Sequence, residues 1–255
     1  MADSKLSFTR IRLFVENDLI AGGALLLGPD QSHYLQNVMR RGVGDQVALF
    51  NGRDGEYQAE LTEIRRGAVR VIVSDQLSPQ RAEPDIWLVF APIKRAAVDF
   101  LTTKATELGV ARLLPVLTAR TNSERVNTRR LGANAIEAAE QSERLCVPII
   151  EKPVRLSTLL ETWPVERCIL LGDETGAGQS LATVAGSLSS DPGPLAVMIG
   201  PEGGFAPDEL DQLRDLPFVV PVGLGPRVLR ADTAAIAALA VVQAIAGDWR
   251  SGRIC

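Results

Sequence analysis

The first part of the chain alternates short apolar segments with turn signals. Asn51-Gly52 and the following Arg53-Asp54-Gly55 are typical of β-hairpin turns. One short helix is expected at residues 33–40, stopped by Gly42. Several short strands and a single helix within this length favour a small closed β-barrel. The strands are expected at residues 12–15, 24–27, 46–50, 56–64 and 68–73.

The pattern changes after residues 76–84, a polar stretch with two prolines that we interpret as a linker. Beyond it, continuous apolar runs typical of buried strands alternate with apolar residues at helical spacing. This alternation predicts an α/β domain with a largely parallel sheet. We therefore expect a barrel domain at 1–75, a linker at 76–84 and an α/β domain at 85–255. In the α/β domain, the expected strands are 86–90, 112–117, 168–171, 195–199 and 218–222, and the expected helices are 94–108, 128–145, 207–216 and 231–246.

Composition narrows the class of protein. Of the 255 residues, 46% are hydrophobic and 23% are charged, which suits a chain that buries an ordinary core. The three cysteines, Cys146, Cys168 and Cys255, are too far apart for a disulfide framework or a zinc site, and His33 is the only histidine. The sequence shows neither a signal peptide nor an apolar run of membrane-spanning length. We therefore expect a cytoplasmic protein without a metal centre.

Charge is unevenly distributed along the chain. The net charge is −4, which argues against a general nucleic-acid binder. Residues 94–130, however, contain eight Lys or Arg against three acidic residues, whereas residues 131–255 are strongly acidic. A local basic region on an acidic chain can bind phosphate backbones, although chance clustering on a solvated surface gives the same pattern.

Three successive strands of the α/β domain end in glycine-bearing loops. The loop sequences are GDETG at 172–176, GPEGG at 200–204 and GLGPRVLR at 223–230. Ligands of open α/β sheets bind outside the carboxyl ends of the strands, and glycine lets a ligand approach the backbone closely. The dinucleotide fingerprint GxGxxG, the phosphate loop GxxxxGK[ST] and a Ser-His-Asp arrangement are all missing. The loops therefore suit an adenosine held mainly by backbone amides and carbonyls.

The combination of motifs resembles the SPOUT methyltransferases, and within them the bacterial 16S ribosomal RNA uridine-N3 methyltransferases. The resemblance rests on GPEGG at 200–204, LGPRVLR at 224–230 and the Thr233-Ala234 helix start. It extends to HYL at 33–35, VMR at 38–40, Gly44-Asp45, KATELGV at 104–110, and Glu140-Gln141-Ser142 with Arg144 and Pro148.

The resemblance implies properties that the residue pattern alone does not reveal. The α/β domain would contain a deep C-terminal trefoil knot, and the N-terminal domain would be a PUA-like barrel that binds RNA. The protein would act as a homodimer on 16S ribosomal RNA or the small ribosomal subunit, with S-adenosylmethionine as cofactor. The expected cofactor-binding residues are Leu171, Gly172, Glu174, Ile199, Gly200, Pro201, Glu202, Gly203, Gly204, Val222, Leu224, Gly225, Val228, Leu229, Arg230 and Thr233.

The expected catalytic residues are Arg230 and Asp232, which follow directly from the third loop. Methylation of uridine N3 requires loss of the N3 proton or stabilisation of the resulting anion, so a base and a cation are needed. The family usually has Thr and Glu where this chain has Ala231 and Asp232. Asp232 also suits an N-cap of the last helix, and Glu140 with Arg144 forms either a surface pair or a second set of functional residues.

Seven arginines are the expected contacts to RNA phosphates. They are Arg10, Arg12, Arg40, Arg41, Arg125, Arg129 and Arg130.

Two alternative functions stay open: an RNA-binding module without enzymatic activity, and a related enzyme that methylates the ribose 2′-oxygen.

Overall fold

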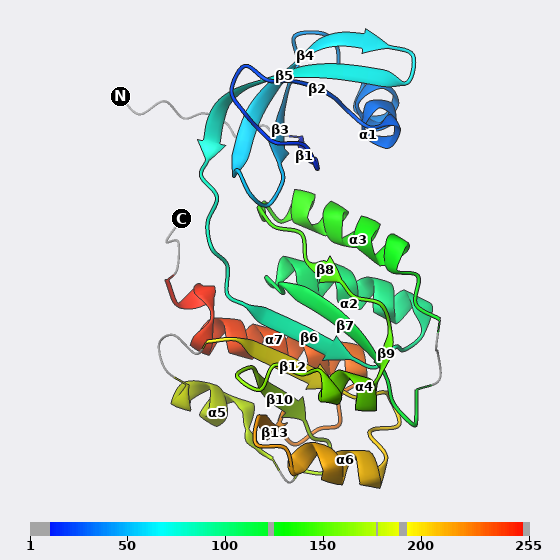
Figure 1. The fold of residues 1–255 in the computed structure, drawn as a ribbon, viewed down its shortest axis with the longest axis vertical. Coiled ribbons are helices and arrows are strands. Elements are labelled where there is room, and N and C mark those ends of the chain that lie inside the picture. Colours follow the sequence, from blue (N-terminus) through cyan, green and yellow to red (C-terminus); the bar gives the residue numbers. More distant parts are fainter. Residues whose placement is uncertain (1–10, 122–124, 177, 189–192, 252–255) are drawn as a thin grey trace. The chain divides into compact units, whose positions relative to one another are not determined.

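The computed structural model describes residues 11–121, 125–176, 178–188 and 193–251, and among the predicted site residues only Arg10 lies outside these ranges. The chain divides into two units (Figure 1). The N-terminal unit comprises residues 1–82 and 139–146, and the C-terminal unit comprises residues 83–138 and 147–255. No helix in the described ranges combines the length and the apolar character that a membrane crossing needs.

The N-terminal unit is built on one five-stranded sheet with the order β1-β3-β4-β5-β2. Strands β1 and β3 run parallel, and the other neighbours are antiparallel. Alternate residues of β3 to β5, such as Leu49, Leu61 and Val71, meet in a single buried core. The strands are β1 Arg12–Phe14, β2 Ala24–Leu26, β3 Gln46–Phe50, β4 Glu56–Arg65 and β5 Ala68–Ser78.

The helical segment of this unit differs from the prediction of one helix at 33–40. Helix α1, Pro29–His33, starts four residues earlier and continues into one π-helical turn, η1, Tyr34–Val38. Pro29 suits the first turn of a helix, and the Gln31 side chain accepts a hydrogen bond from the backbone of Gly28. The segment ends before Arg40, whose φ of 51° lies in the left-handed region.

The C-terminal unit contains an eight-stranded sheet in which all the paired strands are parallel, as predicted. Its order is β11-β13-β10-β12-β6-β7-β8, with β9 paired to β7. The strands are β6 Ile86–Phe90, β7 Arg112–Leu117, β8 Ile149–Ile150, β9 Val154–Arg155, β10 Cys168–Gly172, β11 Gln179–Ser180, β12 Leu195–Ile199 and β13 Val219–Gly223.

Helices cover both faces of this sheet (Figure 1). Leu88 and Phe90 of β6 face the core that includes α2, α5 and α7, whereas Val89 faces the core that includes α4 and α6. This alternation explains why the central strands are apolar throughout. The helices are α2 Arg95–Glu107, α4 Leu156–Glu161, α5 Leu181–Ser187, α6 Pro207–Arg214 and α7 Ala231–Ala246, followed by the 3-10 turn η2 Asp248–Ser251.

Helix α3, Thr128–Gln141, ends four residues earlier than predicted. The carbonyls of Ala139 and Glu140 accept hydrogen bonds from the Arg12 guanidinium at 2.7 and 3.0 Å, and the Arg144 carbonyl accepts another at 3.0 Å. A guanidinium that satisfies free carbonyls at a helix C-terminus stabilises the end of the helix there. The end of α3 is thus fixed by a residue that is distant in sequence.

Candidate functional site

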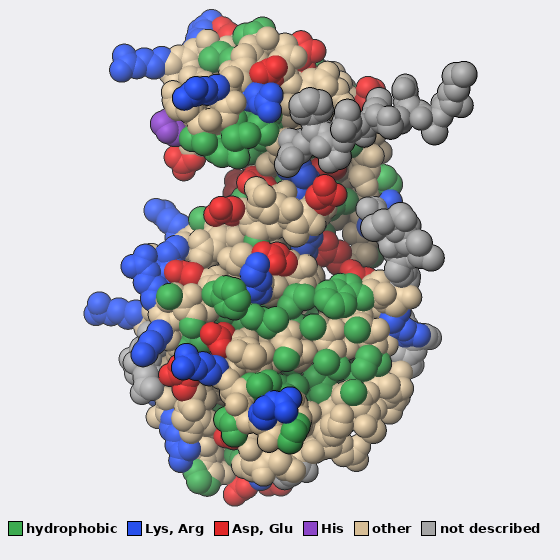
Figure 2. Space-filling model, turned by 180° about the vertical axis from the view of Figure 1, so that it is seen from behind, with side chains coloured by type: hydrophobic (Ala, Val, Ile, Leu, Met, Phe, Trp, Pro, Cys, Tyr) green, Lys and Arg blue, Asp and Glu red, His purple; other side chains and the backbone are tan. Residues whose placement is uncertain are grey.

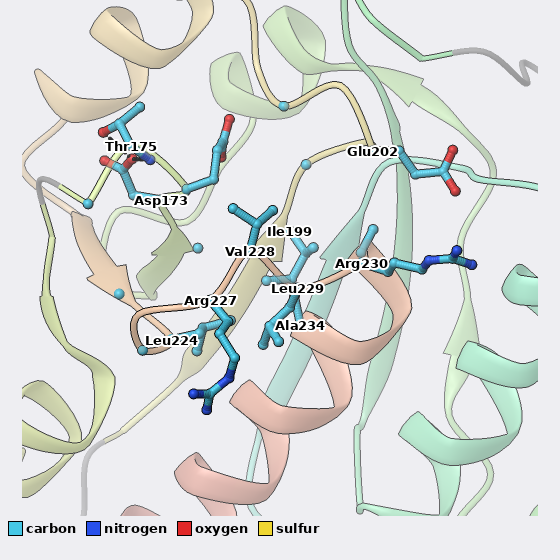
Figure 3. A pocket seen from close by; sticks show the side chains of 18 of the residues that line it. Asp173, Thr175, Ile199, Glu202, Leu224, Arg227, Val228, Leu229, Arg230 and Ala234 are labelled. Atoms are coloured by element: carbon cyan, nitrogen blue, oxygen red, sulfur yellow. Dashed lines mark hydrogen bonds between the residues drawn. The ribbon is translucent and has the colours of Figure 1, made fainter.

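The loops after β10, β12 and β13 meet at one edge of the sheet because these strands are neighbours and parallel. Together with the start of α7 they enclose a cavity of about 670 Å³ (Figure 3). This volume is in the range of sites for small-molecule ligands, about 300–1,000 Å³. The lining residues are Lys94, Gly172, Asp173, Glu174, Thr175, Gly176, Ile199, Gly200, Pro201, Glu202, Gly204, Val222, Gly223, Leu224, Gly225, Pro226, Arg227, Val228, Leu229, Arg230, Ala231 and Ala234.

Most of the residues predicted for the cofactor line this cavity, and three lie outside the lining. Leu171 is fully buried in the core beneath α4 and α6. Thr233 donates from both its backbone and its hydroxyl to Asp232. The carbonyl of Gly203 accepts a hydrogen bond of 2.8 Å from Arg120.

Nine lining residues were not among the predicted ones. Most of them lie within the three loops that the sequence had singled out, between predicted positions. Lys94 comes from a fourth loop, the one after β6, and it is exposed. The same rule of strand ends would have found Lys94, because β6 is the neighbour of β12 in the sheet. The nine are Lys94, Asp173, Thr175, Gly176, Gly223, Pro226, Arg227, Ala231 and Ala234.

The cavity combines apolar side chains with charged ones. Ile199, Leu224 and Leu229 face it together with Ala234, and Figure 3 shows these side chains gathered at its centre. Of the charged lining residues, Asp173 is buried, and the others are exposed: Lys94, Glu174, Glu202, Arg227 and Arg230. Such a site suits a ligand with one apolar, flat part and one strongly polar part.

Asp173 fixes the loop after β10. Its Oδ2 accepts hydrogen bonds of 2.6 and 3.1 Å from Arg214 of α6, and its Oδ1 accepts bonds from the backbone and the hydroxyl of Thr175. Burial raises the pKa of Asp173, but the hydrogen bonds from Thr175 and Arg214 outweigh this effect and leave the pKa below its usual value. The carboxylate is therefore charged at neutral pH and holds the loop against α6.

Gly204 marks a close approach of backbone and side chain in the loop after β12. Its φ is +69°, and a Cβ at this position would meet Oε1 of Glu174 at too short a distance. The neighbouring Gly203 has no such restriction, because a Cβ there would meet only Arg120, at an ordinary 3.8 Å. A side chain at Gly204 is therefore strained by the positive φ and displaces the Glu174 carboxylate, whereas a side chain at Gly203 meets no close neighbour.

Arg230 and Asp232 occupy different environments at the start of α7. Arg230 is the N-cap residue, lines the cavity and is exposed, and within the described residues its guanidinium has no ion-pair partner. Asp232 lies outside the lining, in the first turn of α7, where its Oδ1 accepts a hydrogen bond of 2.7 Å from the backbone of Thr233. The hypothesis that Asp232 is the N-cap is therefore wrong, because the helix starts at Ala231.

The predicted RNA-binding arginines fall into three groups. Arg12 is buried: its Nε bonds Glu56 Oε1 at 2.5 Å, and the guanidinium stacks on Phe50. It has no surface for a phosphate, so the structure does not support an RNA contact there. The side chain of Arg40 is exposed and that of Arg41 is half-buried, in the N-terminal unit. Arg125 and Arg129 are exposed beside the half-buried Arg130, at the start of α3 in the C-terminal unit.

Arg40 allows a test that separates stability from RNA binding. Its left-handed φ of 51° costs a non-glycine residue about 1–2 kcal/mol. We expect Arg40→Gly to stabilise the fold by up to about 1 kcal/mol, after the entropy cost of glycine. The same change should lower the slope of log affinity for RNA against log salt by about one. Chemical unfolding measures the stability, and salt titrations measure the slope for RNA binding. A variant that is less stable than the parent and has the same salt slope would contradict both predictions.

Among the described residues, no three His, Cys, Asp or Glu side chains cluster in a way that could hold a metal ion.

Two family models match the chain. The RNA methyltransferase domain matches residues 80–243, and the RNA methyltransferase PUA domain matches residues 27–74. Among curated proteins, ribosomal RNA small subunit methyltransferase E of Rickettsia conorii is 34% identical, over 91% of this chain and 94% of that protein. These matches agree with the parallel α/β sheet and the separate N-terminal unit.

Solved structures of similar proteins cover almost the whole chain. A putative methyltransferase of Legionella pneumophila in complex with S-adenosylmethionine has a TM-score of 0.84 and 30% identity. Ribosomal RNA small subunit methyltransferase E of Neisseria gonorrhoeae, bound to S-adenosylmethionine, has a TM-score of 0.85 and 26% identity. Each alignment covers 94% of this chain and 99% of the other. The resemblance carried by the glycine loops is thus confirmed, and the chain belongs to the RNA methyltransferase family that includes ribosomal RNA small subunit methyltransferase E.

Proposed function

We propose that this protein transfers the methyl group of S-adenosylmethionine to N3 of a uridine in 16S ribosomal RNA. The observation that carries the proposal is the large cavity formed by the three glycine loops at adjacent strand ends. Two solved structures of the same fold, at 30% and 26% identity, contain bound S-adenosylmethionine. The family gives the class of reaction, and the choice of uridine N3 is our inference from the motifs at 200–204 and 224–230.

One S-adenosylmethionine per chain would occupy the large cavity. Ile199, Val222 and Leu229 offer apolar contacts to the adenine ring, and the loop backbone offers amides and carbonyls to its polar edges. Glu202 and Glu174 are the exposed carboxylates of the lining, and either one suits the positively charged end of the cofactor. When bound, the cofactor supplies an electrophilic methyl group on its sulfonium.

The residues of the chain would prepare the uracil ring for the transfer. The N3–H bond would break with its proton passing to solvent, and the electron pair left on N3 would form the new bond to the methyl carbon as the carbon–sulfur bond breaks. Arg230 is the cation of the lining at the helix start, and it would stabilise the negative charge that develops on the uracil carbonyl oxygens. Asp232, held by Thr233, would act as a positioning residue through the first turn of α7.

We further expect a homodimer in the cytoplasm. Figure 2 shows a broad field of apolar side chains on the C-terminal unit. Phe100 and Trp249, both in this unit, are about half exposed, at 49% and 51%. Large exposed apolar patches mark surfaces that bind other proteins, and here they suit a second copy of the chain.

The trefoil knot and the domain limits 1–75 and 85–255 also stay predictions.

The direct test is to incubate the purified protein with S-adenosylmethionine and small ribosomal subunits that lack the modification, and to map the methylated nucleotide. Methylation at uridine N3 is the expected result. Methylation of a ribose 2′-oxygen would contradict the assignment of uridine N3 and would support the alternative reaction. Binding of RNA without any transfer would identify an RNA-binding module instead.

Two adjacent glycines test the position of the cofactor. We expect Gly204→Ala to weaken S-adenosylmethionine binding about tenfold or more, which is about 1.4 kcal/mol, because Glu174 or the loop has to move. Gly203→Ala is the matched control, since it meets no close neighbour and lies outside the lining. Calorimetry on both folded variants provides the measurement. Equal affinities of the two variants for S-adenosylmethionine would contradict a contact between the loop at 200–204 and the cofactor.

A further inference from the structure

A second, smaller cavity lies in the C-terminal unit, between the β6–α2 loop and the start of α3. Its volume is about 90 Å³, about three times the volume of one water molecule in the liquid. It has room for a group the size of an inorganic anion and is too small for a nucleoside. The lining residues are Pro92, Ile93, Arg95, Val98, Arg125, Val126, Asn127 and Arg130.

The charged side chains of this cavity are predominantly positive. Arg95, Arg125 and Arg130 line it, and Asp99 is the carboxylate that pairs with two of them. The Nε of Arg130 lies 2.9 Å from Asp99 Oδ1, whereas the Nε of Arg95 lies 4.0 Å from Asp99 Oδ2. Within the described residues Arg125 has no partner, so at least one guanidinium is available to an anion.

The backbone at the start of α3 adds to this positive potential. Asn127 Oδ1 accepts a hydrogen bond of 3.1 Å from the backbone of Arg130 and so caps the helix, and the helix N-terminus carries a partial positive charge. Exposed Arg129 lies in the same first turn. Figure 2 shows Lys and Arg side chains gathered along one side of the C-terminal unit.

The two cavities are lined by consecutive residues at the start of α2. Lys94 lines the large cavity and Arg95 lines the small one, and the Cα atoms of consecutive residues are about 3.8 Å apart. A nucleotide whose base enters the large cavity carries phosphates on both sides of its ribose. We expect one of these phosphates to lie near Arg95 and Arg125 while the base faces Arg230.

We propose that the small cavity binds a backbone phosphate of the RNA next to the nucleotide that is methylated. This inference rests on the proposed function, because it assumes an RNA base in the large cavity. It adds Arg95 to the predicted phosphate contacts. It also assigns Arg125 and Arg130 to one subsite with a fixed position relative to the reacting base. Guanidinium groups suit this role, since they can donate two parallel hydrogen bonds to phosphate oxygens.

The test compares two double variants of the full-length protein. Arg95→Gln with Arg125→Gln removes two cations from the small cavity. Lys152→Gln with Arg155→Gln removes two exposed cations from the same unit but from neither cavity. We expect the first pair to weaken binding of a small-subunit RNA fragment about tenfold and to lower its salt slope by about one, with unchanged affinity for S-adenosylmethionine. The control pair should change the slope much less.

A phosphate modification locates the contact. One neutral methylphosphonate next to the target uridine should weaken binding to the parent protein and have little further effect on the cavity variant, because both changes remove the same contact. Equal slope changes in the two double variants, or additive losses with the modified RNA, would overturn the subsite. Failure of the proposed function is a different outcome, in which the parent protein itself binds no S-adenosylmethionine or methylates no RNA.

Discussion

Arg230→Ala is expected to lower the rate of methyl transfer by about 100- to 1000-fold, the typical cost of losing one preorganised donor. The reason is its position: the residue lies at the N-cap position of α7, lines the large cavity and keeps an exposed guanidinium without an ion-pair partner in the described residues. The effect should fall on turnover more than on binding, because the charge that Arg230 stabilises develops only during the reaction. Single-turnover methyl transfer, measured alongside cofactor affinity, separates the two effects.

Two companion variants make this result specific. Arg227→Ala removes another exposed cation of the same cavity and should cost much less in rate, because Arg227 points away from the start of α7 (Figure 3). Asp232→Asn keeps an acceptor for the Thr233 backbone but removes the charge. If Asp232 acts by its charge, the rate falls with this variant too. Normal transfer by Arg230→Ala with normal cofactor binding would exclude Arg230 from the mechanism.

Arg214→Ala is expected to destabilise the protein by about 3 kcal/mol. The side chain of Asp173 is fully buried, and removal of Arg214 leaves its carboxylate with Thr175 as its remaining side-chain partner. Breaking a buried ion pair by deleting one partner typically costs about 3–5 kcal/mol. The lower end applies because Arg214 itself is partly exposed, at 29%. Cofactor affinity should fall as well, since the loop that Asp173 holds lines the large cavity.

The control for Arg214→Ala is Asp211→Asn, which removes the exposed second ion-pair partner of Arg214, at 3.9 Å. This variant should change the stability by less than about 0.5 kcal/mol.

The pH dependence of the stability provides a second check. The pKa of Asp173 in the folded protein lies below its ordinary value of 3.8, so its contribution is complete above that pH and is lost as the pH falls through the folded pKa. The difference between parent and Arg214→Ala should therefore narrow in acid. A constant difference down to pH 2 would contradict this assignment.

The sequence predicted most of the C-terminal unit because its signals are local. The strands at 86–90, 112–117 and 195–199 are apolar, apart from Arg112, and have the observed limits, and Gly247 ends α7 as expected. The short elements β8, β9, β11, α4 and α5 were missed. Each has two to seven residues, too few for a hydrophobic period, and its conformation depends on strands and helices formed elsewhere in the unit.

The sequence predicted the part of the candidate site that lies in the glycine loops after the strands. Three glycine loops located the cavity, whereas Lys94 was missed because its loop contains no glycine. Arg12 shows the limit for single side chains. A basic residue near the N-terminus of an RNA-binding domain favours a phosphate contact, and only tertiary structure shows that its guanidinium bonds three backbone carbonyls and Glu56.

The network around Arg12 has a consequence for the order of events during synthesis. The carbonyls that Arg12 needs belong to Ala139, Glu140 and Arg144, yet the strands of the same unit are complete by Ser78. At about 5–20 residues per second, several seconds pass on the ribosome between these two points. During that interval the Arg12 guanidinium can pair with Glu56 and stack on Phe50, but it lacks its three carbonyl partners. The N-terminal unit therefore reaches its final form only after much of the methyltransferase domain has been made, and a fragment that ends at the linker lacks part of its own structure.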